Sequence, residues 1–420
     1  MTQDGERAAL EGDREDRIRG LPRNVTDLIL ELLPAQDAAR TSILSRNWRY
    51  IWATLPNLVL DYDFCRKLIE ESESMFKLAV DEILLLHMGN IVKFILDTRG
   101  AHFSSCADID KWVLYVTRNG VKKLTLRISN LNTYTLPPSI FKCSTLTDLE
   151  LTNCVFKPPS SFLGFPNLIS LDLQRTTFVP TTSFCVIKAP LLEDLSLNMC
   201  HGSQYLNIIS PGLKSLYVRD SYYHLVLNCF MNCKDLRVFK LDFYKVADEK
   251  STLEKLLISL PALEVLHLDS YFLELLSADV VPNGLPFTLN FLRHLSLCVA
   301  FDHLGQTSYA LQLIKNSPNL RKLVIWVDAT DDDAKAVLKY LDSPSCLERP
   351  LNKLEHVSIN IYESAKAELC FVKQLLSRTP SLLRMRISQK TDIDVDIALE
   401  LMRFPRASPR AELSYFPYQD

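Results

Sequence analysis

The feature that most constrains the fold of this chain is a recurring hexamer of the form LxxLxL, in which other apolar residues replace leucine at some positions. It occurs twelve times, and successive copies start 21 to 34 residues apart. Leucine-rich repeats have a period of roughly 20–29 residues, so nearly every interval fits, and the longest one indicates an insertion. The hexamers are IVKFIL at 91, VKKLTL at 121, LTDLEL at 146, LISLDL at 168, LEDLSL at 192, LKSLYV at 213, LRVFKL at 236, LEVLHL at 263, LRHLSL at 292, LRKLVI at 320, LEHVSI at 354 and LLRMRI at 382.

Each hexamer predicts a short strand whose apolar residues share one face, because side chains along a strand point alternately to opposite sides. One strand cannot bury that face alone, whereas stacked repeats form a parallel sheet with a continuous apolar core behind it. Leucine accounts for 72 of the 420 residues, which is enough to build such a core. Helical periodicity between the hexamers predicts return helices at 110–119, 252–260 and 371–377. The fold class that follows is α/β, a leucine-rich-repeat solenoid with a parallel sheet.

The third and fifth residues of each hexamer, and the residue just after it, are predicted to lie on the exposed face of the sheet. This face runs from acidic to basic along the chain and carries aromatic residues of the kind favoured at interfaces. Repeat proteins bind partners on such faces, although a merely solvated face has the same pattern. We expect target contacts at Asp148, Glu150, Asp172, Asp194, Tyr217, Arg219, His267, Trp326, Arg384 and Arg386. The same positions include Lys240, Asp242, Asp269, His294, Lys322 and His356.

Residues that could support catalysis or bind a metal are sparse. Three histidines at matching strand positions, His267, His294 and His356, lie in different repeats without a carboxylate or thiol cluster, which favours solvated polar roles over a metal site. The sequence lacks GxxxxGK[ST], GxSxG, HExxH and GxGxxG. The 11 cysteines include no CxxC pair, so we expect reduced and mostly buried thiols. We predict no catalytic residue, no metal and no cofactor; an enzyme that depends on one cysteine or histidine is a further hypothesis.

Charge and hydropathy narrow the range of partners and compartments. The formal net charge is -3, so no global basic field favours binding to nucleic acid. The N-terminus lacks the apolar segment of a signal peptide, and no run approaches about 18 apolar residues. We expect no nucleic-acid partner, no membrane partner, and a location in the nucleus, the cytoplasm or both.

Residues 16–60 have the pattern of three short helices. A helical stripe of Val25, Leu28, Ile29, Leu32 and Leu33 predicts the first helix, which the following proline ends. The second helix fits residues 37–44 and the third fits residues 48–55. A bundle of this size has a marginal core, so it is expected to pack on a partner or on the repeats. The segment SMFKLAVDEILLL that follows also has helical periodicity, so we predict that the bundle abuts the repeats without a flexible linker.

The three-helix segment resembles an F-box of the plant type. The matching elements are LP at 21–22, ILxLLP at 29–34, DAARTS at 37–42, LSR at 44–46 and WRxxW at 48–52. In that family an F-box typically precedes leucine-rich repeats and a C-terminal FBD region, and residues 354–388 followed by LMRFPRASPRAEL resemble an FBD. The resemblance implies a disordered N-terminus at 1–15, an F-box at 16–60, leucine-rich repeats at 61–345 and an FBD region at 346–420 that continues the repeat stack.

This resemblance to plant F-box/FBD/LRR-repeat proteins implies a substrate receptor of an SCF-type cullin–RING ubiquitin ligase. In such receptors the F-box binds a Skp-type adaptor, which connects it to a cullin and a RING protein, and the repeats hold an unknown target for ubiquitination. The alternative is a ligase-independent scaffold that uses the same repeat face. Carried over to this sequence, the adaptor contacts are Leu21, Pro22, Ile29, Leu32, Leu33, Leu44, Trp48 and Trp52. For Trp48, the sequence favours packing in the core of the bundle as much as it favours contact with the adaptor.

Overall fold

The computed structural model divides the chain into two compact units, Met1–Val155 and Phe156–Asp420. The described residues are 21–33, 35–41, 43, 46–100, 105–129, 133–181, 183–220, 227–243, 250–277, 284–328, 334–343, 346–361, 366–389 and 394–417. The predicted N-terminal segment 1–15, Leu44 and the side chain of Trp48 lie outside this description. The division into units falls inside the predicted repeat region, so the domain boundaries at 60/61 and 345/346 stay predictions.

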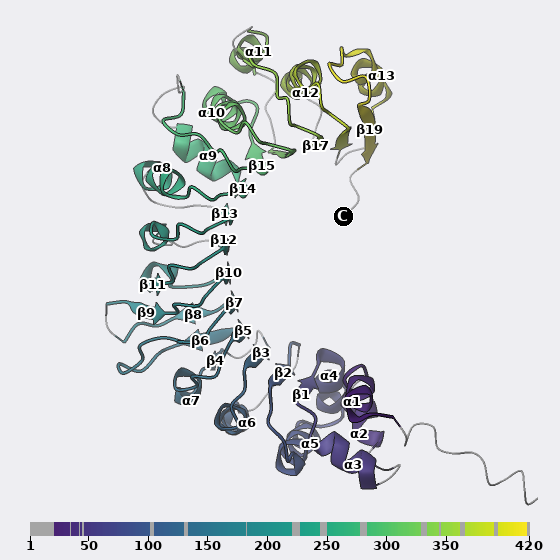
Figure 1. Cartoon of the computed structure of the whole chain (residues 1–420), viewed down its shortest axis with the longest axis vertical. Coiled ribbons are helices and arrows are strands. Elements are labelled where there is room, and N and C mark those ends of the chain that lie inside the picture. The colour runs from purple at the N-terminus through teal and green to yellow at the C-terminus, as the bar shows by residue number, and fades with distance from the viewer. Residues whose placement is uncertain are drawn as a thin grey trace, which may run out of the picture. The chain divides into compact units, whose positions relative to one another are not determined.

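The first unit begins with three short helices, which confirms the helical bundle predicted from the sequence (Figure 1). The helices are α1 (Arg23–Glu31), α2 (Ala35–Thr41) and α3 (Arg46–Ala53). The first helix starts after Pro22, whose fixed backbone conformation, with φ -55° and ψ 145°, is extended. Leu30, Ala38, Ile51 and Leu55 form a small buried cluster, against which Trp52 packs. A core this small leaves much of the apolar surface of the bundle unburied.

The rest of the first unit is a parallel sheet with the strand order β1, β2, β3, β5. Backbone hydrogen bonds join the end of α3 to the segment before β2, so the prediction that the bundle abuts the first repeat is confirmed. Helix α6 covers one face of the sheet with the buried side chains Ile109, Trp112, Val113 and Val116. The elements are β1 (Asn57–Leu60), α4 (Tyr62–Glu71), α5 (Glu73–Leu86), β2 (Lys93–Asp97), α6 (Ala107–Arg118), β3 (Lys123–Arg127), β4 (Tyr134–Thr135), α7 (Pro138–Phe141), β5 (Asp148–Thr152) and β6 (Cys154–Phe156).

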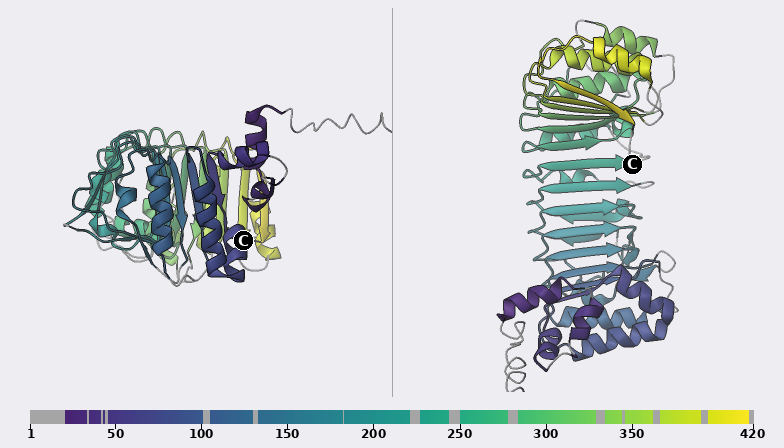
Figure 2. Two further views of the ribbon diagram at one scale, coloured as in Figure 1. Left: turned by 90° about the horizontal axis from the view of Figure 1, so that it is seen from below. Right: turned by 90° about the vertical axis from the view of Figure 1, so that its right-hand side faces the viewer.

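The second unit contains a longer parallel sheet, whose strands lie side by side and point the same way (Figure 2). Its strands are β7 (Ser170–Gln174), β10 (Asp194–Asn198), β12 (Ser215–Asp220), β13 (Val238–Phe243), β14 (Val265–Leu268), β15 (His294–Val299), β16 (Lys322–Val327), β17 (His356–Ile361), β18 (Arg384–Gln389) and β19 (Glu412–Pro417). Short strands and 3-10 turns pack behind the first repeats of this unit: β8 (Thr177–Phe178), β9 (Cys185–Lys188), η1 (Ser203–Tyr205), β11 (Leu206–Ile209) and η2 (Leu227–Phe230).

Helices replace these short return segments in the later repeats of the second unit and lie on one side of the strands, so the other side is the exposed face of the sheet (Figure 1). They are α8 (Lys250–Ser259), α9 (Ser270–Ser277), α10 (Leu304–Lys315), α11 (Lys335–Leu341), α12 (Lys366–Arg378) and α13 (Val395–Arg403). The predicted return helices at 252–260 and 371–377 correspond to α8 and α12, and that at 110–119 to α6.

A row of buried apolar residues that pair from strand to strand, which we call the leucine ladder, fixes the register of the repeats. Leu195 pairs with Leu216, which pairs with Phe239, and the same level continues through Leu266 and Leu295. All of these side chains are buried. Since burying a leucine contributes roughly 1.5–3 kcal/mol, a slip of one residue, which would expose the whole row, is strongly disfavoured.

Sharp turns follow the strands in the early repeats. Asn153, Arg175 and Met199 all occupy the eighth position counted from the start of their hexamer and have φ between 48° and 59°. The left-handed conformation turns the chain sharply away from the sheet. At Asn153 the side-chain amide donates to the carbonyl of Ile128 over 2.7 Å, which satisfies a buried polar group of the preceding repeat.

Candidate functional site

Helix α1 and the two residues that follow it expose four of the five residues of the predicted apolar stripe, whereas Val25 is half-buried. Leu30 is 1% exposed in the small core, whereas Leu32 is 85% exposed, and Leu28, Ile29 and Leu33 are also exposed. Contiguous apolar surface of this kind marks protein interaction sites in soluble proteins. The stripe therefore forms a candidate docking surface, which we call the α1 face (Leu28, Ile29, Leu32 and Leu33).

The other residues predicted to contact an adaptor have different environments. Pro22 is exposed and Leu21 is half-buried beside the start of α1. Trp52 is half-buried against the core of the bundle, so part of its ring has a structural role. Ile43 is an exposed apolar side chain that the motif comparison did not single out, because it lies between two matching elements.

A groove of about 280 Å³ lies between the bundle and the first strands. Leu28, Leu32 and Leu33 of the α1 face line one side, and Trp52 and Ile83 also contribute to its wall. The lining is mostly apolar, which suits an apolar side chain of a protein partner.

Helix α5 has a second apolar face, which its sequence periodicity did not reveal. Phe76, Val80 and Leu84 are buried, and Phe76 packs edge-on against Trp112 of α6 with ring centroids 5.7 Å apart. On the opposite side, four apolar side chains at helical spacing are exposed, with Leu85 at 82%. We call this stripe the α5 face: Met75, Leu78, Leu85 and Leu86.

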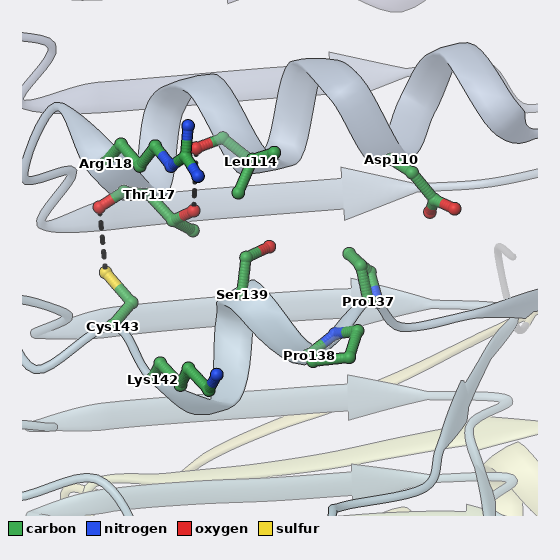
Figure 3. Close-up of a pocket in the computed structure, with 9 residues that line it drawn as sticks. All are labelled: Asp110, Leu114, Thr117, Arg118, Pro137, Pro138, Ser139, Lys142 and Cys143. Carbon is green, nitrogen blue, oxygen red and sulfur yellow. Dashed lines mark hydrogen bonds between the residues drawn. The ribbon is translucent and has the colours of Figure 1, made fainter.

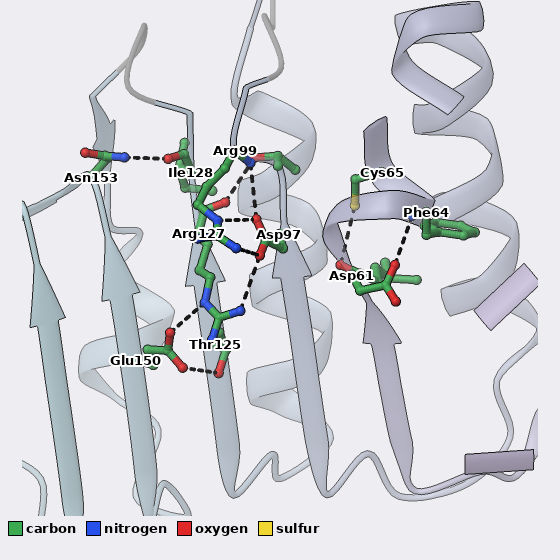
Figure 4. Close-up of polar contacts among 12 residues, drawn as sticks. Asp61, Phe64, Cys65, Asp97, Arg99, Thr125, Arg127, Ile128, Glu150 and Asn153 are labelled. Atoms are coloured by element: carbon green, nitrogen blue, oxygen red, sulfur yellow. Dashed lines mark hydrogen bonds and ion pairs between the residues drawn. The ribbon is translucent and has the colours of Figure 1, made fainter. Parts of the chain in front are cut away.

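The exposed sheet face of the first unit is crossed by a chain of ion pairs (Figure 4). Arg127 donates from Nε to Glu150 Oε1 over 2.6 Å and lies 3.3 Å from Asp97 Oδ2, which also accepts from Arg99 over 2.7 Å. The hydrogen bond to Glu150 is the main cause that raises the pKa of the Arg127 guanidinium. Lys123 pairs with Asp148 over 3.2 Å. Two predicted target contacts, Asp148 and Glu150, therefore already have cationic partners within the chain.

In the second unit the predicted contacts fall into three groups. Asp172, Asp194, Arg219, Trp326, Arg384 and Arg386 are exposed. Tyr217 and His267 are half-buried, and His267 shares a hydrogen bond of 2.9 Å with Ser296. Asp269 was expected to be exposed and is buried, because α9 begins directly after it and its carboxylate accepts from the backbone nitrogen of Phe272 over 3.1 Å.

Several of the described cysteines are held in the thiol form by burial. Burial raises the pKa of Cys185, Cys233, Cys298 and Cys346 to about 11, where the thiolate is scarce at neutral pH. Among the described residues, no group of three or more histidine, cysteine, aspartate or glutamate side chains could hold a metal ion.

A cavity of about 550 Å³ lies between α6 and α7 of the first unit (Figure 3). Arg118 and Lys142 line it together with Leu114, Pro137 and Pro138. Its acidic lining residue, Asp110, accepts a hydrogen bond of 2.7 Å from Tyr134, and its thiol, Cys143, points toward backbone carbonyls of the neighbouring repeat. The residues that line this cavity do not pair a nucleophile with a base, and they have no evident catalytic use.

Comparison with known proteins gives matches along nearly the whole chain. A model of the F-box domain matches residues 18–60, and a model of the leucine-rich repeats of the FBD-associated F-box protein At5g56370 matches residues 109–325. The F-box/FBD/LRR-repeat protein At1g13570 of Arabidopsis thaliana is 34% identical, over 96% of this chain and 99% of its own length. The FBD-associated F-box protein At4g10400 of the same plant is 25% identical, over 95% of this chain and 100% of its own length.

Among the helices that the structure describes, none is long and apolar enough to cross a bilayer.

Proposed function

This chain belongs to the family of F-box/FBD/LRR-repeat proteins, and we propose from this that it is the substrate-recognition subunit of an SCF-type cullin–RING ubiquitin ligase. The F-box binds a Skp-type adaptor, and through it a cullin and a RING protein. The leucine-rich repeats bind the protein that is to be ubiquitinated. The chain itself carries out no chemistry in this proposal: it holds the target near the charged ubiquitin carrier and so raises the local concentration of the reacting groups.

The observation that carries the proposal is the exposure of the α1 face. The buried cluster of the bundle consists only of Leu30, Ala38, Ile51 and Leu55. The bundle would be more stable if a partner also covered the leucines of the α1 face. A partner with an apolar groove supplies that cover, and each buried leucine then contributes roughly 1.5–3 kcal/mol to binding before the costs of association.

The test is the affinity of the purified full chain for a Skp-type adaptor, measured by titration calorimetry. Replacing Ile29 and Leu32 by glutamate places two charges on the α1 face, and we expect affinity to fall at least 100-fold. Leu163→Glu, which places a charge at an exposed leucine of the second unit, is the control and should bind as the unchanged chain does. Circular dichroism and thermal unfolding verify that each variant is folded. Equal affinity of the double variant and the control would defeat the proposal.

The ligase-independent scaffold makes a different prediction in cells. A receptor shortens the lifetime of its target, so deleting residues 1–60 should stabilise bound proteins while leaving their capture by the repeats intact. A scaffold would retain its partners, and their lifetimes would be unchanged by the deletion.

A further inference from the structure

The exposed sheet face between β13 and β18 carries cations that lack acidic partners. Lys240 on β13, Lys322 on β16 and Arg386 on β18 are exposed, and their side chains form no ion pair or hydrogen bond with a residue that the structure describes. We call this surface, with His267, His294 and His356 between these cations, the basic face. It lies wholly within the second unit.

Strand register places these side chains in two rows. Lys240, His267, Ser296, Val324, Ser358 and Arg386 occupy one level across the six strands. His294, Lys322, His356 and Arg384 occupy the next level. Because neighbouring strands lie about 4.8 Å apart, the row from Lys240 to Arg386 spans five gaps, or roughly 24 Å. Lys240 and Arg386 are thus at the two ends of one row and Lys322 is in the next row, so the cations are separated and are not gathered at one point.

Acidic residues of the same repeats are already paired at the borders of this surface. Asp242 lies 3.3 Å from Arg219, and Glu412 lies 3.5 Å from Arg384. Asp269 is buried and caps α9. Two of these carboxylates are thus paired and one is buried, and Asp242 also acts on His267 in the direction that raises its pKa.

The lysines of the basic face lie close enough to His294 to affect its pKa. The pKa of His294 is lowered to about 4, first by burial and then by the nearby charges of Lys322 and Lys240. The Nε2 atom of His294 is buried without a hydrogen-bond partner among the described residues. Trp326, 38% exposed two levels beyond Lys322 on β16, adds an aromatic side chain to the same face of the sheet.

We infer that the basic face binds an extended, acidic segment of the target protein, which lies across the strands β13 to β18. The inference rests on the proposed function and names the chemistry of the target. An extended chain advances about 3.3 Å per residue, so a segment of seven or eight residues covers the row. Every second side chain of such a segment points toward the sheet, which spaces its carboxylates about 7 Å apart and lets different carboxylates reach Lys240, Lys322 and Arg386.

The spread of charge favours carboxylates over a phosphorylated residue. A phosphate is recognised by several donors that converge on one point, often through the forked guanidinium of arginine. Here Arg386 and Lys322 lie on different strands, two strand gaps apart, and Arg384 is already paired with Glu412. Separate single charges on the partner match separate cations on the face.

The test is fluorescence anisotropy of the full chain with three labelled eight-residue peptides at about 50 mM salt, where screening is modest. One alternates glutamate with serine, one alternates glutamine with serine, and one carries a single phosphoserine in the glutamine background. We expect the glutamate peptide to bind at least tenfold more tightly than either of the others. Equal binding of all three, no binding of the glutamate peptide, or preference for the phosphopeptide would overturn the inference.

Two matched variants locate the binding surface. Lys322→Gln with Arg386→Gln should weaken the glutamate peptide at least tenfold. Lys188→Gln with Lys234→Gln removes the same charge from exposed positions of the second unit outside the basic face, and it should weaken the peptide less than twofold. If both variants lost the same affinity for the glutamate peptide, the binding would depend only on net charge, and the inference would be overturned. Adaptor affinity is measured on the same samples. If the chain binds the adaptor but shows no preference among the peptides, this inference is refuted while the proposed function stands.

Discussion

The backbone nitrogen of Met88 donates a hydrogen bond of 2.7 Å to the carbonyl oxygen of Ala53. This bond ties the segment after α5 to the end of α3 and so places the C-terminal turn of α5 beside the F-box. The exposed side chains of Leu85, Leu86 and Met88 lie at this junction. The F-box and the first repeat therefore present apolar surface together within the first unit.

The α5 face is expected to contribute to adaptor binding. Replacing Leu85 and Leu86 by glutamate should weaken the adaptor complex about tenfold, or roughly 1.4 kcal/mol, because apolar contact area is lost. Both side chains are exposed, so thermal stability should be unchanged. Met402→Glu, at an exposed position on α13, is the control. Wild-type affinity in the double variant would restrict the docking surface to the F-box.

The leucine ladder should carry most of the stability of the second unit. Leu266→Ala removes a fully buried side chain in the middle of the ladder and should lower the free energy of unfolding by about 2–5 kcal/mol. Leu163→Ala, at an exposed position, should change it by less than about 0.5 kcal/mol. Chemical denaturation followed by circular dichroism measures both. A loss below about 1 kcal/mol for Leu266→Ala would contradict the described packing.

Arg127 is expected to be a structural residue of the first unit. Its side chain bridges Glu150 and Asp97, and Asp97 is only 3% exposed. Arg127→Gln should lower the free energy of unfolding by about 2 kcal/mol, because a buried carboxylate loses one of its two cations. Lys123→Gln breaks the more exposed pair with Asp148 and should cost less than about 1 kcal/mol. If both variants lost a similarly small part of the free energy of unfolding, the ion pairs of Asp97 would contribute little to stability.

Protonation of His294 is expected to destabilise the second unit in acid. Its pKa lies near 4 in the folded chain and near 6.5 when unfolded, so the unfolded state binds more protons between these values. Stability therefore falls as pH drops from about 6.5 towards 4, by at most about 3 kcal/mol for this group. His294→Gln removes the titration, and its unfolding free energy should depend less steeply on pH. Parallel pH profiles for the two chains would contradict this assignment.

Periodicity predicted the repeating part of the fold well. Each of the twelve hexamers contains a strand, because a buried row of leucines at strand spacing leaves little choice of structure. The outer strands β1 and β19 have no full hexamer and were missed; each pairs with one neighbour only, so its sequence is less constrained. Regular patterns therefore revealed the strands that belong to full hexamers and missed β1 and β19.

The sites were harder to predict because exposure depends on tertiary contacts. Glu150 and Asp148 have the spacing of free acidic residues, yet both are paired across strands. Asp269 has the spacing of an exposed residue and is a helix cap. On α5, periodicity indicates a helix but does not tell which of its two apolar faces is buried. The F-box motif includes Ile29, Leu32 and Leu33, which the structure exposes, but it also includes Leu30, which is buried; contact of the three exposed residues with an adaptor stays a prediction.

Hydrogen exchange of the full chain, with and without a Skp-type adaptor, tests the central claim most directly. Docking of the F-box should slow exchange of backbone amides in α1 and in the last turn of α5, while exchange in β13 to β18 stays unchanged. Absence of protection in both helices at saturating adaptor, or protection confined to the repeats, would contradict the account.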